Sequence, residues 1–259
     1  MRFLKCFILA IVILFFNVHS EAAEVWKELK GNHFIIYYQN APLDFIKTAN
    51  ESAEQYYEEI TRNLGFTRYA GWVWEERAKI YVYDNNDAYV QSKQNLKWSS
   101  GEAFIQNKVI RTFPQAVGFF DSTLPHEMGH LIFREFVGQK AQVPLWFEEG
   151  VAMYQEKAKR YGANDAVRQA IKAEQFLSIK ELNQIKLNNN TDQNKVNLFY
   201  AESASIVYYM ITELGEFRFE QFCRELQKER PFEYTLSSVY VRFRDLDQLN
   251  KAWLDYLQK

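Results

Sequence analysis

The sequence predicts an α+β fold, because strand-like and helical stretches alternate in its first part and helical patterns alone fill its second. From residue 24 to about 120 the expected order is strand, helix, strand, short helix and one or two further strands. After about residue 155 apolar residues recur only at three- and four-residue spacing. We therefore expect a mixed-sheet lobe over residues 24–138 and a helical lobe over residues 139–259, which together enclose one core.

Residues 1–23 have the order of a secretory signal peptide. Two basic residues precede an apolar run from Cys6 to Phe16, and small residues lead to an expected cleavage site after Ala22 or Ala23. The run is shorter than the roughly 20 residues of a transmembrane helix. We predict an exported protein, periplasmic or secreted, that is anchored to a membrane only if this segment stays uncleaved. Cys223 would then be the only cysteine of the mature chain, which excludes an intrachain disulfide.

The composition is that of an ordinary folded protein, with 47% hydrophobic and 25% charged residues. A net charge of −2 gives no indication of a nucleic-acid partner or an acidic membrane surface. The 21 Phe and 16 Tyr suit a substrate groove as well as a core, and we favour core packing. Composition says nothing about the oligomeric state.

The sheet lobe is predicted from short apolar alternations separated by one long amphipathic stretch. Gly65 closes that long stretch, a helix. His33 lies at the start of the first strand, where we favour a strand-edge role over a catalytic one. The expected elements are a strand at His33–Tyr38, a helix at Leu43–Leu64, a strand at Ala78–Tyr83, a short helix at Asp87–Lys93 and one or two strands within Ala103–Phe113.

The motif His126-Glu127-Met128-Gly129-His130 predicts a zinc site on a helix over residues 122–137. Asp121, Ser122 and Thr123 are expected to start the helix and Gly138 to end it. His126 and His130 would lie one turn apart on one face, where Cβ atoms are about 5–6 Å from each other and two imidazoles can bind one metal. Glu127, rotated roughly 100° from His126, would flank the metal as a proton acceptor.

A catalytic zinc ion of this kind needs a third protein ligand. Eighteen residues separate His130 from Glu149, which lies in a second helical segment that begins with Pro144 and carries the run W-F-E-E-G-V-A-M-Y, ending at Tyr154. The two motifs at this spacing resemble the gluzincin metallopeptidases, in particular bacterial peptidase MA-like domains. By that resemblance Glu149 is the third ligand. Its neighbour Glu148 should point away, toward solvent or the helix flank.

The resemblance implies a zincin fold with Zn²⁺ between the two lobes, and a peptidase that hydrolyses peptide bonds with Glu127 as general base. A tyrosine is expected to stabilise the oxyanion. Tyr200 is our candidate, because peptidase MA-like domains resemble the chain around its helix, although packing at the start of that helix explains Tyr200 equally well. Tyr154 and Tyr161 are lesser candidates.

In gluzincins an edge strand upstream of the zinc helix pairs with the substrate backbone. By resemblance this strand contains Gly101, Glu102 and Ala103, and such pairing supplies affinity through main-chain hydrogen bonds. Gluzincin aminopeptidases bind the substrate amine with a glutamate of a GxMEN motif, but only Gly101-Glu102 matches here. We therefore favour an ordinary carboxylate at Glu102 and an endopeptidase over an aminopeptidase.

The chain departs from the thermolysin branch at Met153, where that branch has an aspartate that supports a ligand histidine. Another acceptor is expected, since ligand histidines almost always donate their second N–H. The sequence does not identify this acceptor.

The helical lobe is predicted from five amphipathic stretches. They are separated by Gly162, the loop 188–190, Gly215 and Pro231. The stretches are residues 163–176, 179–186, 195–214, 216–228 and 244–258.

Two other functional classes compete with an enzyme. A binding or assembly module could retain the metallopeptidase fold without activity, but such loss usually removes one of His126, Glu127, His130 or Glu149, and all four are present. A chance motif on a structural helix would leave the position of Glu149 unexplained. A zinc peptidase acting on a peptide or protein substrate is the function that we predict.

Overall fold

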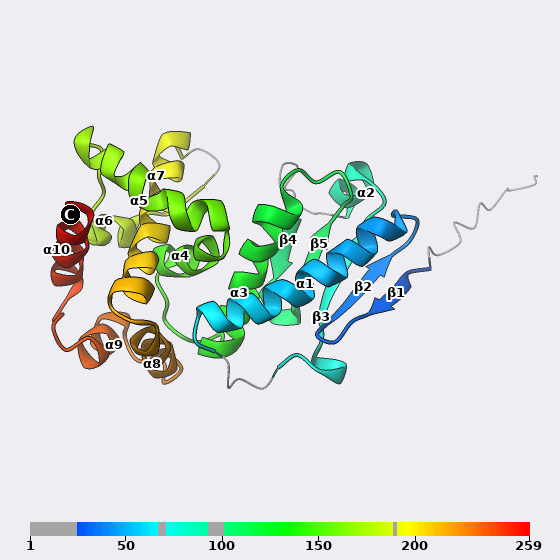
Figure 1. Cartoon of the computed structure of the whole chain (residues 1–259), viewed down its shortest axis with the longest axis horizontal. Coiled ribbons are helices and arrows are strands. Elements are labelled where there is room, and N and C mark those ends of the chain that lie inside the picture. Colours follow the sequence, from blue (N-terminus) through cyan, green and yellow to red (C-terminus); the bar gives the residue numbers. More distant parts are fainter. Residues whose placement is uncertain (1–24, 67–70, 93–100, 189–190) are drawn as a thin grey trace, which may run out of the picture.

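A computed structural model describes residues 25–66, 71–92, 101–188 and 191–259. A small mixed sheet with its covering helices forms one side of the molecule, and a helical part forms the other (Figure 1). The predicted α+β class is therefore correct. The predicted signal peptide lies outside the described residues. Within them, no helix is both long and apolar enough to cross a membrane.

The sheet has five strands in the order β1-β2-β3-β5-β4. The central strands β2, β3 and β5 are parallel, while β1 and β4 are antiparallel to their neighbours. Strand β4 is thus an edge strand, as expected for the segment upstream of the zinc helix. The strands are β1 (Lys27–Lys30), β2 (Phe34–Tyr38), β3 (Ala78–Val82), β4 (Gly101–Phe104) and β5 (Val109–Thr112).

One face of the sheet is covered by helices. Ile36, Ile80 and Ile110 lie in register across the three parallel strands and are fully buried. Helix α1 (Leu43–Asn63) packs against β2 and against the zinc-motif helix α3, which in turn contacts β4 (Figure 1). The alternating burial of β3 reflects this one-sided cover. Short helical turns complete the lobe: Trp74–Glu76, α2 (Asn86–Gln91) and Ile105–Asn107.

Helix α3 (Leu124–Val137) carries the histidine motif and begins two residues later than predicted. The residues expected to cap it, Asp121 to Thr123, belong to a π-helical turn, Phe119–Thr123, that leads directly into α3, so none of them caps the helix. Ser122 instead donates its hydroxyl to a carboxylate of the site. Gly138 ends the helix as predicted, with a φ of +87° that few side chains tolerate.

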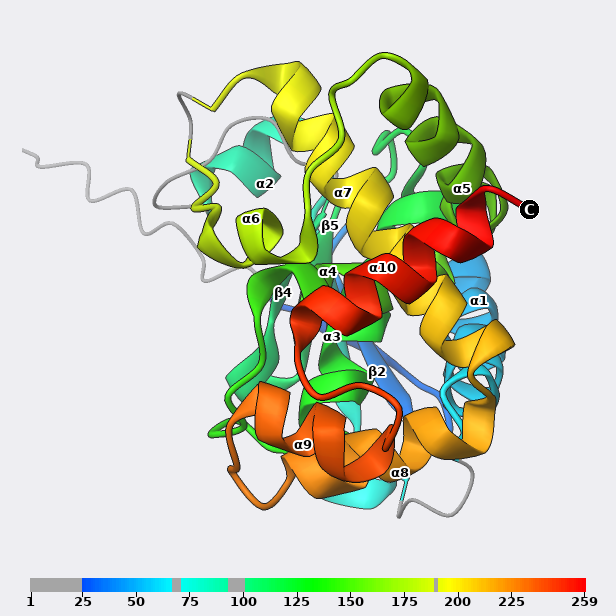
Figure 2. The ribbon, with the colours of Figure 1, turned by 90° about the vertical axis from the view of Figure 1, so that its left-hand side faces the viewer.

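The helical part contains seven α-helices within the described residues. Gly162 lies inside α5 rather than before it, and α9 was not predicted. Viewed from this end (Figure 2), α10 crosses the middle, with α8 and α9 below and α5, α6 and α7 above. The helices are α4 (Leu145–Gln155), α5 (Lys157–Lys172), α6 (Ile179–Gln184), α7 (Gln193–Tyr208, extended by the π-turn Tyr209–Glu213), α8 (Glu216–Leu226), α9 (Phe232–Val239) and α10 (Leu246–Leu257).

Aromatic side chains hold helices α8 and α9 against α4. Phe147 on α4 lies within 5.2 to 5.8 Å, between ring centroids, of Phe219, Phe222 and Phe232. All four are buried, and Phe147 packs edge-to-face with Phe222 and Phe232, a geometry that adds to the stability from burial alone. The expectation that the aromatics serve mainly the core holds for this cluster.

Candidate metal centre

Two glycines let α3, α4 and α7 approach closely around the site. A Cβ atom on Gly129 would lie 3.0 Å from the Cα atom of Ala152 on α4, and one on Gly150 would lie 2.4 Å from the carbonyl oxygen of Ser203 on α7. Neither position has room for a side chain. The glycine inside the histidine motif and the glycine after Glu149 therefore set the spacing between the helices that carry the candidate ligands.

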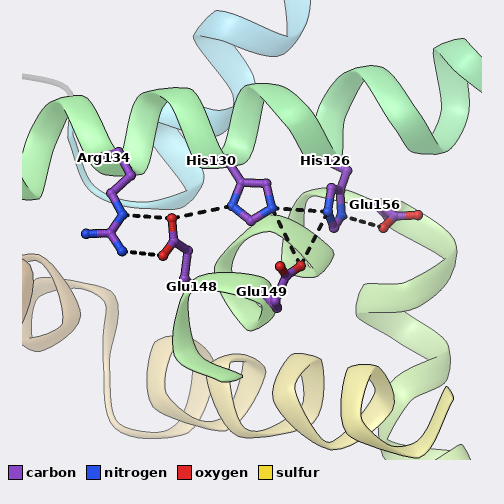
Figure 3. Close-up of polar contacts among 6 residues, drawn as sticks. All are labelled: His126, His130, Arg134, Glu148, Glu149 and Glu156. Atoms are coloured by element: carbon purple, nitrogen blue, oxygen red, sulfur yellow. Dashed lines mark hydrogen bonds and ion pairs between the residues drawn. The ribbon is translucent and has the colours of Figure 1, made fainter. Parts of the chain in front are cut away.

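The structure brings the three predicted ligands together. His126 and His130 point from α3 toward Glu149 on α4 (Figure 3). Their Nε2 atoms are 3.2 Å apart, and each lies 3.6 Å from Oε2 of Glu149. All three side chains are at least four-fifths buried, with exposures of 18%, 12% and 16%. One oxygen and two nitrogens thus converge on a single point.

The geometry of this triangle suits a zinc ion. Ligand atoms about 2.0–2.1 Å from a tetrahedral zinc ion are roughly 3.3–3.4 Å from one another. The observed separations of 3.2 and 3.6 Å bracket that range. Two imidazoles and one carboxylate are also a common donor set of catalytic zinc sites, which keep a fourth position open.

The electrostatics of the site favour a cation. Burial lowers the pKa of His126, but hydrogen bonds to Glu149 and Glu156 and the charge of Glu127 outweigh it and raise that pKa to about 10. Burial likewise raises the pKa of Glu149, yet its contacts with His126 and His130 lower it to about 2. The carboxylates around His126 therefore attract a positive charge to this point.

Glu156 supplies the acceptor that the sequence did not identify. Its Oε1 lies 3.0 Å from Nδ1 of His126, and its other oxygen accepts the hydroxyl of Ser122. Because a carboxylate only accepts, Nδ1 carries the hydrogen and Nε2 faces the site. Glu156 follows Glu149 by seven residues, a helical spacing that could have indicated a shared face.

Glu148 does not point to solvent, which rules out one of the two directions expected from helix geometry. It forms a paired contact with the guanidinium of Arg134, with Nε at 2.7 Å, and its Oε1 lies 3.8 Å from Nδ1 of His130 (Figure 3). The residue is 12% exposed. Glu148 therefore lies behind His130 as Glu156 lies behind His126, but only Glu156 is within hydrogen-bond distance of its imidazole. Met153, the position of the aspartate in the thermolysin branch, is buried and apolar.

Glu127 and Tyr200 are half-buried at the same site. Burial raises the pKa of Tyr200 to about 12, with further contributions from the negative charges of Glu149, Glu127 and Glu156. These couplings place the Tyr200 hydroxyl in the electrostatic field of the metal centre. Tyr200 and His126 also line one pocket of about 520 Å³.

The lesser tyrosine candidates are less well placed. Tyr161 is 70% exposed on α5. Tyr154 is buried, with the guanidinium of Arg160 4.2 Å from its ring centroid. Neither lines the pocket beside His126.

The predicted substrate strand lies at the sheet edge, where Gly101 and Ala103 belong to β4. Glu102 sits opposite Arg111 on β5, and the guanidinium Nη1 lies 3.9 Å from its Oε1. The Glu102 carboxylate is therefore explained as the partner of Arg111 in a cross-strand ion pair.

His33 is separate from the centre. Its Nδ1 lies 2.6 Å from Oε2 of Glu54, and its ring stacks on Tyr57 at 4.0 Å between centroids. These contacts belong to the packing of α1 against the sheet.

Comparisons with known proteins identify similar chains. A family model described as the Peptidase MA superfamily matches residues 65–259. The structure of native yeast LTA4 hydrolase is similar with a TM-score of 0.51 at 15% identity, over 88% of this chain. The same enzyme in complex with bestatin gives a TM-score of 0.47 at 16% identity, over 89% of this chain. The chain spans 38% and 37% of the lengths of these two structures. No curated protein sequence matches it.

Proposed function

Because the chain belongs to the Peptidase MA superfamily, we propose that it is a zinc-dependent peptidase of the gluzincin type, and specifically an endopeptidase. The observation that carries this proposal is the convergence of two imidazole nitrogens and one carboxylate oxygen within 3.2 to 3.6 Å of one another. His126, His130 and Glu149 would hold the ion.

A zinc ion in this position supplies Lewis acidity: it lowers the pKa of water toward about 7 and polarises the carbonyl of a peptide bond. The protein supplies the proton transfers. Glu127, one residue after His126 on α3, accepts a proton from the attacking water and returns it to the departing amine. Glu156 keeps the imidazole of His126 oriented through its hydrogen bond, and the carboxylate of Glu148 faces the imidazole of His130 at 3.8 Å.

Tyr200 has the properties of an oxyanion donor. Its pKa of about 12 keeps the hydroxyl protonated at neutral pH, so it can donate a hydrogen bond to the negative oxygen that develops on the substrate. Its position on α7, close to the charges of Glu127 and Glu149, supports this role.

The substrate side favours internal cleavage of a peptide or protein. Strand β4 offers main-chain groups at the edge of the sheet next to α3, which suits an extended polypeptide. Glu102 would anchor a free amine weakly, because Arg111 already neutralises part of its charge. The N-terminal signal pattern supports an activity outside the cytoplasm, in the periplasm or the medium.

The experiment that tests this function compares Glu127→Gln with Glu135→Gln, the same substitution eight residues later on α3. Hydrolysis of a peptide library by Glu127→Gln should fall by about 10²–10⁴-fold, while zinc stays bound. Glu135→Gln should cleave like the wild type. Near-normal turnover by Glu127→Gln would remove the proposed general base and with it the mechanism.

A further inference from the structure

The pocket beside the metal centre has no role in the mechanism above. We propose that it receives a bulky, uncharged side chain of the peptide substrate, and so sets which bonds the protein cleaves. This inference rests on the proposed peptidase function and names the substrate class that the site prefers.

Small residues create the space. Helices α5 and α7 face each other across the pocket, and at six lining positions neither contributes more than a methyl group. The resulting volume of about 520 Å³ lies within the range of about 300–1,000 Å³ that is typical of ligand pockets. These positions are Ala158, Gly162, Ala163 and Ala166 on α5 and Ala201 and Ala204 on α7.

The floor of the pocket is apolar. Met153, Ala163 and Ala204 are buried and form a small cluster, separate from the main core, against which Tyr200 packs. An apolar side chain of the substrate would cover this cluster and release the water that contacts it. The flexible methionine side chain can adjust to occupants of different shape.

The charged groups of the pocket do not favour a charged occupant. The carboxylate of Glu156 is held by His126 and Ser122, and Glu156 is 4% exposed. Lys159 lies on the exposed rim. An ionised side chain that reached the apolar floor would lose its hydration without gaining a partner there.

The pocket and the metal centre share two side chains. His126 and Tyr200 line the pocket, while His126 is a candidate ligand and Tyr200 the candidate oxyanion donor. A side chain inserted between α5 and α7 would therefore hold its own backbone beside the reacting carbonyl. This continuity distinguishes the pocket from three other cavities of the described residues, which include no candidate ligand.

Gly162→Leu tests the assignment without disturbing the fold. A Cβ atom at Gly162 would meet no other atom within 4 Å, so a larger side chain enters open space. Leucine also favours a helix more than glycine does, and Gly162 lies inside α5. Gln169→Leu is the matched control, because it creates the same exposed leucine on the same helix outside the pocket.

The measurement is kcat/KM for peptides that carry Phe, Leu, Ala or Asp at each position flanking the cleaved bond. The wild type should prefer Phe or Leu over Ala and Asp by about tenfold or more at one position. Gly162→Leu should lower kcat/KM for the Phe and Leu peptides by about tenfold and change the Ala peptide less than about threefold. Gln169→Leu should keep the wild-type preference.

Affinity gives a second readout that does not depend on turnover. In the Glu127→Gln background, the Phe peptide should bind more tightly than the Ala peptide, and adding Gly162→Leu should remove the difference. Glu127-dependent cleavage whose preference Gly162→Leu leaves intact would overturn the pocket assignment alone. Peptide cleavage that does not depend on Glu127 would overturn the proposed function as well. A wild-type protein that cleaves none of the peptides would do the same.

Discussion

Nδ1 of His126 lies 3.0 Å from Oε1 of Glu156, and this contact determines which ring nitrogen faces the candidate metal centre. Glu156 sits at the end of α4, the helix that also carries Glu149. Helix α4 and the residue that directly follows it thus supply both a candidate ligand and the acceptor that orients a second ligand.

Glu156→Gln should weaken zinc binding by about 10–100-fold, because the amide keeps the shape of the side chain but loses the negative charge behind His126. Zinc affinity measured by competition with a chromogenic chelator checks this. Glu59→Gln is the control, since Glu59 pairs with Lys157, the neighbour of Glu156, outside the centre. Equal affinity in the wild type and Glu156→Gln would show that the contact does not support the metal.

Tyr200→Phe should reduce kcat by about 10²-fold or more with little change in KM, because the lost hydroxyl would act only on the developing negative charge. Steady-state kinetics on one peptide separates the two parameters. Tyr161→Phe on the exposed surface of α5 should have no effect. A change in kcat below about threefold would assign Tyr200 to packing.

Glu202 gives a pH dependence that is independent of the metal. It is fully buried on α7, and Oε1 accepts the N–H of Leu177 at 2.9 Å. Burial is the main cause that raises the pKa of this carboxyl from 4.5 to about 8. Between pH 4.5 and about pH 8 the folded protein keeps a proton on Glu202 that the unfolded chain releases. The Glu202 carboxyl therefore makes the fold less stable as the pH rises through this range.

Glu202→Gln should therefore unfold at a higher temperature than the wild type. The difference should be small at pH 5 and should grow toward pH 8, because glutamine stays neutral and can still accept the N–H of Leu177. Thermal unfolding at several pH values checks this. Glu233→Gln, at an exposed position on α9, should show no such trend. A difference that stays constant from pH 5 to 8 would contradict it.

The elements that could be predicted from the sequence are those whose apolar residues recur at a regular spacing. Strands β2 and β3 and helix α1 alternate or repeat their apolar residues, and they were found within one or two residues. Strand β1 was missed because three of its four residues are exposed, so it has no apolar alternation. The short helix α9 follows Pro231 directly and was not distinguished from a loop.

The candidate centre was predictable only where one helix fixes the geometry. The spacing of His126 and His130 follows from a single helical turn, and resemblance supplied Glu149. The positions of Glu148 and Glu156 depend on how α4 packs on α3 and α7, through the close contacts at Gly129 and Gly150. No local pattern of residues reveals that packing, which is why Glu148 was expected to point toward solvent or the helix flank and its contact with Arg134 was not predicted.

The central claim is that His126, His130 and Glu149 hold one zinc ion. The most direct test is elemental analysis of the purified chain from residue 24 onward, beside His130→Ala and the control His33→Ala, whose histidine contacts Glu54 in the sheet lobe. We expect about one zinc per chain in the wild type and in His33→Ala, and a loss of zinc in His130→Ala. A wild-type protein without zinc after reconstitution at neutral pH, or a His130→Ala variant that retains zinc, would show that these three residues do not form the zinc site.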